Sequence, residues 1–246
     1  MLSSLFLKAA NYLPPMAKIF NNAADYFEQH EKKAILYAQF KEEIKLGTFD
    51  EMDACQRISY SVHGKKFRRD GRPYVESHIK SVVDTPNRYV DIIYSPDQEK
   101  LAWVHDTPED ARGAWRVKHF RRMGFSNEFC EGLDGHTIRP GEKYLDYIER
   151  LSKTIALEVK IGDNRHNWAD NPKPHKANLY RISSHYLLAV KYGRIAPGSS
   201  IAEWAAQEGM YDAEIFGKYS SRPIIKDYIS PRNKLHMSGI PAPIAV

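Results

Sequence analysis

The chain has 246 residues, of which 42% are hydrophobic and 27% are charged, and its formal net charge is +5. These values are ordinary for a globular protein with a sizeable core, and the modest basic excess suits either an anionic small molecule or a nucleic acid. No apolar run reaches the roughly 18 residues of a membrane span. The two cysteines, Cys55 and Cys130, form no disulfide framework. We therefore expect a cytoplasmic protein with no membrane partner.

The N-terminal part of the chain predicts helices on either side of a basic loop. Residues 1–48 are expected to form a helical extension, because they are rich in helix formers. Their apolar opening lacks the basic start of a secretion signal, so it is not interpreted as one. Asp50 is placed to cap a helix over residues 51–63. After the loop "GKKFRRDGRP", a helix is expected to begin near Tyr74, because apolar residues recur from Val75 at helical spacing.

The middle of the chain continues with helices separated by turns. A helix is expected over residues 97–107, opened by Pro96, with Pro108 ending or bending it. Two shorter helices separated by Gly124 follow. The strongest helical stretch, "GEKYLDYIERLSKTIALEVKIGDNRHNWAD", comes next and is expected to divide near Ser152 and Lys153.

The C-terminal part predicts two more helices and an irregular end. One helix is expected over residues 175–191, and another follows the serine cap in "SSIAEWAAQEG". The ending from Arg222 contains four of the 14 prolines and predicts an irregular arm. Since strand patterning is scarce, the fold class is all-α. We expect an N-terminal helical extension (1–48), a central domain (49–191), and a C-terminal helical extension and arm (192–246).

The segment "LAWVHDTPED" places four ionisable groups directly after an apolar run. Residues four apart share a helix face, so His105 neighbours Glu109 and Asp106 neighbours Asp110. Imidazole and carboxylate groups that converge at a helix end can hold Mn²⁺, Fe²⁺, Zn²⁺ or Co²⁺. The alternative is a capped helix end with solvated carboxylates.

Two further helices carry a polar residue on a face that is expected to be buried. His78 lies on the apolar stripe of its helix, and Asp163 interrupts the apolar run in "LEVKIGDNRHNW". A lone buried histidine is usually hydrogen-bonded within the core, but a buried carboxylate needs a partner or a metal. A single metal site explains all three helices at once.

The order H…HD…D resembles the metal-binding pattern of the HD-domain phosphohydrolases, and its details resemble the RelA/SpoT-type alarmone hydrolases. The matching stretches are "RRDGRPYVESH", "HDTPED" and "KIGDNRHN". The stretch "HTIRPGEKYLDYIERL" is similar to one in the small bacterial and phage members. The resemblance covers residues 50–170 and implies an HD-domain helical bundle that removes the 3′-pyrophosphate of ppGpp-like nucleotides.

The resemblance also implies roles for single residues. One divalent metal, Mn²⁺, is the implied cofactor, and its ligands fall on His78, His105, Asp106 and Asp163. The carboxylates that orient or activate the attacking water fall on Glu109 and Asp110. The groups that reach the nucleotide substrate fall on Arg68, Arg69, Tyr74, Lys160 and Asn167.

The residue types also suit metal-dependent hydrolysis of a phosphate ester, independently of the family resemblance. A bound metal lowers the pKa of its water toward about 7, and nearby Arg or Lys side chains balance the charge of phosphate oxygens. The basic loop supplies five basic residues against one acid in "GKKFRRDGR". Directly before a ligand helix, this loop is expected to grip phosphate.

Other functions stay open at this point. An HD-type phosphohydrolase could act instead on NADPH, a deoxynucleotide or a cyclic nucleotide, and a non-catalytic module could bind a nucleotide without cleaving it. A nucleic-acid-binding protein is disfavoured, because the basic residues cluster beside the metal motif. Trp204, if exposed, would suit the interface of a homo-oligomer, although a tryptophan at helical spacing is more often core.

The chain departs from the family pattern in the basic loop and in the last motif. "DGRP" is shorter than the family turn that shapes the base pocket, which leaves the base of the nucleotide open. Gly162 stands directly before Asp163, where it is expected to loosen the helix. Glu142, Tyr144 and Tyr147 match the small members, and helix packing is the favoured interpretation of all three.

Overall fold

The computed structural model of the protein describes residues 2–12 and 17–222. Within these residues it contains helices and no strand, apart from an isolated bridge between Phe67 and Pro73 in the basic loop. The predicted all-α class is therefore confirmed. The irregular arm predicted from Arg222 lies, beyond Arg222 itself, outside the described residues.

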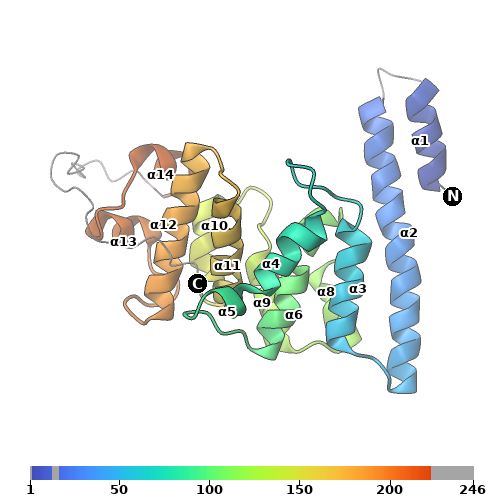
Figure 1. Cartoon of the computed structure of the whole chain (residues 1–246), viewed down its shortest axis with the longest axis horizontal. Coiled ribbons are helices and arrows are strands. Elements are labelled where there is room, and N and C mark those ends of the chain that lie inside the picture. Colours follow the sequence, from blue (N-terminus) through green and yellow to red (C-terminus); the bar gives the residue numbers. More distant parts are fainter. Residues whose placement is uncertain (1, 13–16, 223–246) are drawn as a thin grey trace.

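Two N-terminal helices stand at one side of the molecule (Figure 1). α1 (Leu2–Tyr12) lies against α2 (Ala17–Leu46), where the ring of Phe6 stacks on Phe27 with 5.3 Å between centroids. Farther along α2, Phe40 is fully buried in the core of the remaining helices. The predicted helical extension is thus present in the described residues, and the C-terminal half of α2 packs on the central bundle.

The elements that will supply the site lie at the centre of the bundle. They are α3 (Glu51–His63), the π-helical turn η2 (Val75–Ile79), α4 (Lys80–Val83), α6 (Pro96–Val104) and α11 (Ala156–Ala169). The cap predicted for α3 is confirmed, because the Asp50 carboxylate accepts a hydrogen bond from the Asp53 amide at 2.7 Å. α11 packs against both α4 and α6, which brings distant parts of the sequence together.

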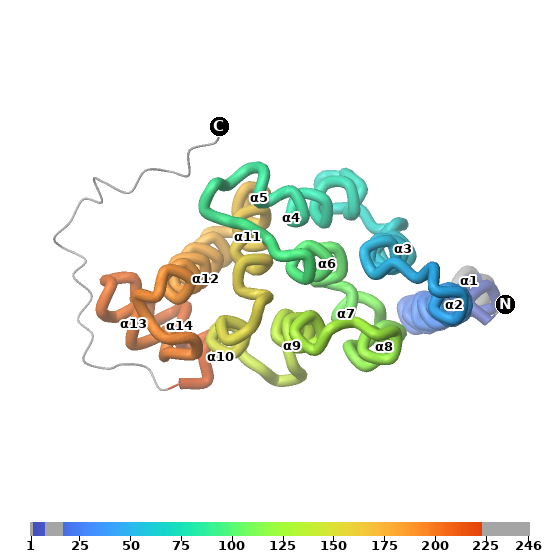
Figure 2. The backbone as a smooth tube through the Cα atoms, turned by 90° about the horizontal axis from the view of Figure 1, so that it is seen from below, coloured from blue at the N-terminus to red at the C-terminus, as the bar shows by residue number. Residues whose placement is uncertain are grey.

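The remaining helices enclose this centre on several sides (Figure 2). They are α5 (Thr85–Arg88), α7 (Thr107–Asp110), α8 (Val117–Met123), α9 (Asn127–His136), α10 (Tyr144–Leu151), α12 (Pro174–Lys191), α13 (Ile201–Gln207) and α14 (Ala213–Tyr219). One cluster of buried apolar side chains extends from Phe40 to Phe216. Trp204 lies in this cluster against Tyr186, so it is a core residue and offers no exposed interface. No helix in the described part of the chain has both the length and the apolar character needed to cross a bilayer.

The helix expected over residues 97–107 is shorter in the structure. α6 begins at Pro96, behind a capping box of Ser95 and Gln98, and ends at Val104. Pro108 does not end it but lies in the first turn of α7. Proline is tolerated in a first turn because the backbone N–H that it lacks has no partner there. The interruption between the two helices therefore lies before the proline, at His105 and Asp106.

Gly162 allows α11 to lie close to its neighbours. A β-carbon at this position would stand 2.5 Å from the Thr85 hydroxyl oxygen and 2.8 Å from the Tyr94 hydroxyl oxygen. The helix runs unbroken through the glycine, so the expectation that Gly162 loosens it is not met. The glycine instead permits α11 to pack closely against Thr85 and Tyr94, next to the buried Asp163.

Gly162→Ala is expected to lower the free energy of unfolding by about 1–3 kcal/mol through overpacking, although alanine is the better helix former. Thr85 is buried, and the Tyr94 hydroxyl donates a hydrogen bond to the Val82 carbonyl at 3.1 Å, so neither neighbour moves freely. Adding Thr85→Ala should recover part of the loss. Urea unfolding of the two single variants and the double variant measures this coupling, and strictly additive losses would contradict the packing argument.

Candidate metal centre

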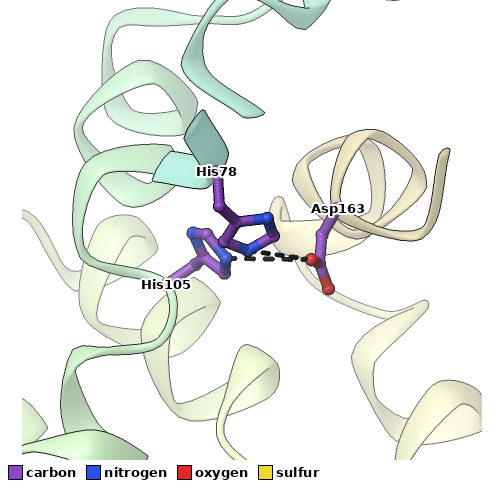
Figure 3. Close-up of side chains that lie close together, drawn as sticks. All are labelled: His78, His105 and Asp163. Carbon is purple, nitrogen blue, oxygen red and sulfur yellow. Dashed lines mark ion pairs between the residues drawn. The ribbon is translucent and has the colours of Figure 1, made fainter. Parts of the chain in front are cut away.

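Three buried side chains from separate elements converge at the centre of the bundle (Figure 3). His78 comes from η2, His105 directly follows α6, and Asp163 comes from α11. One ligand atom from each lies within 4.8 Å of the others. The Asp163 Oδ1 atom is 3.4 Å from His78 Nε2 and 3.9 Å from His105 Nε2.

A wider helical turn presents His78 to this group. In η2 the Lys80 amide donates to the Val75 carbonyl five residues earlier, the pattern of a π-helix. Single π-helical turns are rare and occur often at functional sites. This turn keeps Val75 and Ile79 in the core while it directs His78 toward α11.

Asp106 faces both histidines from a more open side. Its Oδ2 atom lies 3.2 Å from His105 Nε2 and 3.4 Å from His78 Nε2. The Tyr74 hydroxyl donates a hydrogen bond to the same oxygen at 2.5 Å. The Asp106 side chain is 24% exposed, so this carboxylate borders solvent while the three convergent residues do not. The structure thus brings all four predicted ligands together.

This arrangement fits a single divalent cation. Nitrogen and oxygen ligands that bind one Zn²⁺ at about 2.0–2.2 Å lie about 3–3.5 Å from each other, close to the distances seen here. The His105 Nδ1 atom lies 2.8 Å from the Ala102 carbonyl oxygen, to which it can only donate. In neutral His105 the lone pair is therefore on Nε2, which is buried and makes no hydrogen bond to a described residue. Two imidazoles with carboxylates suit Mn²⁺, Fe²⁺ and Zn²⁺.

The electrostatics of the site favour positive charge between the carboxylates. Burial lowers the pKa of His105, but Asp106 and Asp163 outweigh burial and raise it to about 9. Burial likewise raises the pKa of Asp163, but Lys160 and the two histidines hold it well below its usual range. Both carboxylates are consequently ionised at neutral pH, and a divalent cation would take the place of the proton on His105.

Lys160 and Asn167 hold the Asp163 carboxylate in place. The Lys160 ammonium donates to Asp163 Oδ2 at 2.7 Å, and the Asn167 amide donates to Asp163 Oδ1 at 2.6 Å. Lys160 is buried, and its ammonium lies 5.6 Å and 5.4 Å from the ring centroids of Tyr144 and Tyr147. These rings stabilise the buried cation by cation–π contact. Tyr144 and Tyr147 thus have a role beyond helix packing, and Lys160 contacts the ligand rather than an open pocket.

The two carboxylates after the His-Asp pair have different surroundings. Glu109 accepts a hydrogen bond from the Ile138 amide at 2.8 Å and forms no ion pair with a described residue, and partial burial together with Asp106 raises its pKa. Asp110 instead pairs with Lys66 at 2.8 Å and lies 3.4 Å from His63 Nδ1. Asp110 is therefore engaged by a basic side chain, whereas Glu109 is the carboxylate that no described cation pairs with.

A cavity of about 420 Å³ lies beside the four predicted ligands. It is lined by Phe67, Arg68, Arg69, Asp70, Tyr74, Asn167, Asp170, Pro172 and Tyr180. Tyr74 belongs to the cavity and also contacts Asp106, so the cavity opens next to the ligands. Arg68 forms an ion pair with Asp170, whereas Arg69 is exposed and makes no ion pair with any described residue. Four of the five predicted substrate-binding residues therefore line one cavity, and Lys160 does not.

Sequence patterns did not single out several residues of the site. His166 Nδ1 lies 2.8 Å from His78 Nδ1, and the ring of His136 lies 5.1 Å from that of His105. His63 is buried against Tyr74 and near Asp110. A signal existed for His166, since it stands within the "KIGDNRHN" motif on the face next to Asp163. His63 and His136 end helices remote in sequence, and only packing brings them here.

The sequence shows no match to known protein families or curated proteins. Only the residues and geometry of this chain therefore indicate its function.

Proposed function

We propose that this chain is a metal-dependent phosphohydrolase of the HD-domain type, with one divalent cation, Mn²⁺, as its cofactor. The observation that carries the proposal is the convergence of His78, His105 and Asp163 within 4.8 Å of one another, from three separate elements. Asp106 completes the ligand set on the more open side. Placing two imidazoles and two ionised carboxylates together in the protein interior costs free energy, and a cation bound between them would offset that cost.

The proposed substrate is a ppGpp-like nucleotide, from which the enzyme removes the 3′-pyrophosphate. The cavity beside the ligands supports an anionic nucleotide, since it combines Arg68 and Arg69 with the rings of Phe67, Tyr74 and Tyr180. Arginine binds phosphate oxygens with several parallel hydrogen bonds. Aromatic rings offer flat apolar walls to a base.

In this mechanism the residues of the chain have separate roles in hydrolysis. When bound by His78, His105, Asp106 and Asp163, a divalent cation would supply a water of lowered pKa and balance charge on the phosphate oxygens. Glu109, three residues after Asp106 and held by the Ile138 amide, would orient the attacking water and accept its proton. Arg69 grips the outer phosphate oxygens, and Tyr74 holds Asp106 in place through its hydroxyl. Lys160 and Asn167 fix Asp163 from behind.

We further propose that the protein works in the cytoplasm on a small-molecule substrate. Cys55 and Cys130 are both free and buried, as is common in a reducing compartment. Basic groups that face the cavity serve the nucleotide, so no nucleic-acid partner is required.

The proposal predicts Mn²⁺-dependent release of pyrophosphate from ppGpp. The purified chain would be incubated with ppGpp, NADPH, deoxynucleoside triphosphates and cyclic nucleotides, each with Mn²⁺ and with a chelator. We expect pyrophosphate from ppGpp in Mn²⁺ and none after chelation. Release from another nucleotide would retain the site and change the substrate, and metal binding without any turnover would indicate a nucleotide-binding module instead.

A further inference from the structure

The two ligand histidines are held by different kinds of partner. The Nδ1 atom of His105 lies 2.8 Å from the Ala102 carbonyl oxygen. The Nδ1 atom of His78 lies 2.8 Å from the Nδ1 atom of His166. A carbonyl oxygen only accepts hydrogen bonds, whereas an imidazole nitrogen can donate or accept. His105 is thus fixed in one tautomer by the backbone, and the tautomer of His78 depends on His166.

The geometry requires one proton between His78 and His166. Two Nδ1 atoms at hydrogen-bond distance share a bond only when one carries the hydrogen and the other offers a lone pair. If His166 donates, the hydrogen of neutral His78 is on Nε2 and points at Asp106 and Asp163, both 3.4 Å away. If His78 donates, its Nε2 offers a lone pair to the same place. Only the second arrangement lets His78 bind a cation.

We infer that His166 is a positioning residue that accepts a hydrogen bond from His78 Nδ1 and thereby commits His78 Nε2 to the metal. The inference rests on the proposed metal site and assigns a residue outside the ligand set. A ligand histidine commonly donates its second N–H to a fixed acceptor, which orients the ring and increases its basicity as a ligand. Here the acceptor is one turn of α11 beyond Asp163, so one helix positions two ligands.

The position of His166 supports this role. It stands three residues after Asp163 on α11, and its ring centroid lies 4.9 Å from that of His78. It also lines a second cavity of about 580 Å³, beside Arg72 and Ser77. The ring is therefore bordered by the buried ligand on one side and a cavity on another.

Two nearly isosteric substitutions separate hydrogen bonding from packing. In His166→Asn the side-chain oxygen can occupy the place of Nδ1 and accept the hydrogen bond, whereas His166→Leu has the same branching and no acceptor. Mn²⁺ and Zn²⁺ affinities would be measured by calorimetry, with the metal-free unfolding of each variant as a check on folding. His185→Leu is the matched control, because this partly buried histidine lies on α12 among Arg181, Arg194 and Arg165.

We expect His166→Leu to weaken metal binding by about 10–100-fold, and His166→Asn and His185→Leu to remain within a few-fold of the wild type. Nitrogen-15 NMR of the Zn²⁺ form should show the hydrogen of His78 on Nδ1 in the wild type and in His166→Asn. Equal metal affinity in the Leu and Asn variants would overturn the inference while leaving the proposed function intact. Absence of metal binding by the folded wild-type chain would overturn both.

Discussion

Asp163→Ala is expected to abolish metal binding and to lower the free energy of unfolding by about 3–5 kcal/mol, the cost of leaving one partner of a buried ion pair alone. Lys160 is that partner, with its ammonium 2.7 Å from the carboxylate and almost no contact with water. Loss of a direct ligand should reduce metal affinity by more than the roughly 100-fold that a supporting residue can cost. Calorimetry with Mn²⁺ and chemical unfolding measure the two effects.

A second substitution separates stability from metal binding. Lys160→Met in the Asp163→Ala background removes the unpaired cation, so stability should recover while metal binding stays absent. Asp134→Ala serves as the control, since this exposed carboxylate pairs only with Arg139 and surface changes of this kind stay within about 0.5 kcal/mol. A double variant that regains metal binding would show that Asp163 is not a ligand.

Glu109→Gln is expected to lower kcat by about 10²–10⁴-fold without changing metal affinity, as expected when a general base is removed. Glu109 receives a hydrogen bond from the Ile138 amide and contacts none of the four predicted ligands directly. Its pKa is raised above 4.5 by partial burial and by Asp106, so the wild-type rate should rise with pH as the carboxylate ionises. Steady-state kinetics across pH would show this acid limb in the wild type and its loss in the variant.

Asp110→Asn provides the matched comparison for Glu109. Asp110 already pairs with Lys66 and borders His63, so its removal should disturb the basic loop and affect KM more than kcat. A loss of kcat in Asp110→Asn as large as that in Glu109→Gln would reverse the roles we assign to the two carboxylates.

The helices were predictable wherever local rules decide them. Asp50 and Ser200 cap the helices that the sequence assigns to them, and Gly124 ends α8 in the left-handed conformation that glycine favours. The end of α6 was less predictable, because Pro108 permits a new helical turn as readily as it ends an old one. α14 was not anticipated, although the Asp212 carboxylate caps its first turn.

The convergence of His78 and Asp163 was predictable, because each is a polar residue in an apolar pattern. Their surroundings were not, because hydrogen bonds between helices leave no periodic trace in the sequence. Lys160 matches a substrate-binding position in the family pattern, yet in the fold its ammonium is turned inward to Asp163 by the rings of Tyr144 and Tyr147. The ion pair of Asp110 with Lys66 likewise depends on the fold and leaves no trace in the periodicity.

The ion pair between Arg68 and Asp170 gives the cavity a counter-anion of its own. Asp170 also pairs with Arg72 at 3.1 Å, so one carboxylate neutralises part of two guanidinium groups. An anion that binds Arg68 as well as the unpaired Arg69 would have to replace Asp170, and at Arg68 a singly charged ligand would exchange one attraction for an equal one. A pyrophosphate brings more charge than it displaces. We therefore expect the cavity to prefer multiply charged over singly charged anions, because Asp170 competes with the ligand for Arg68.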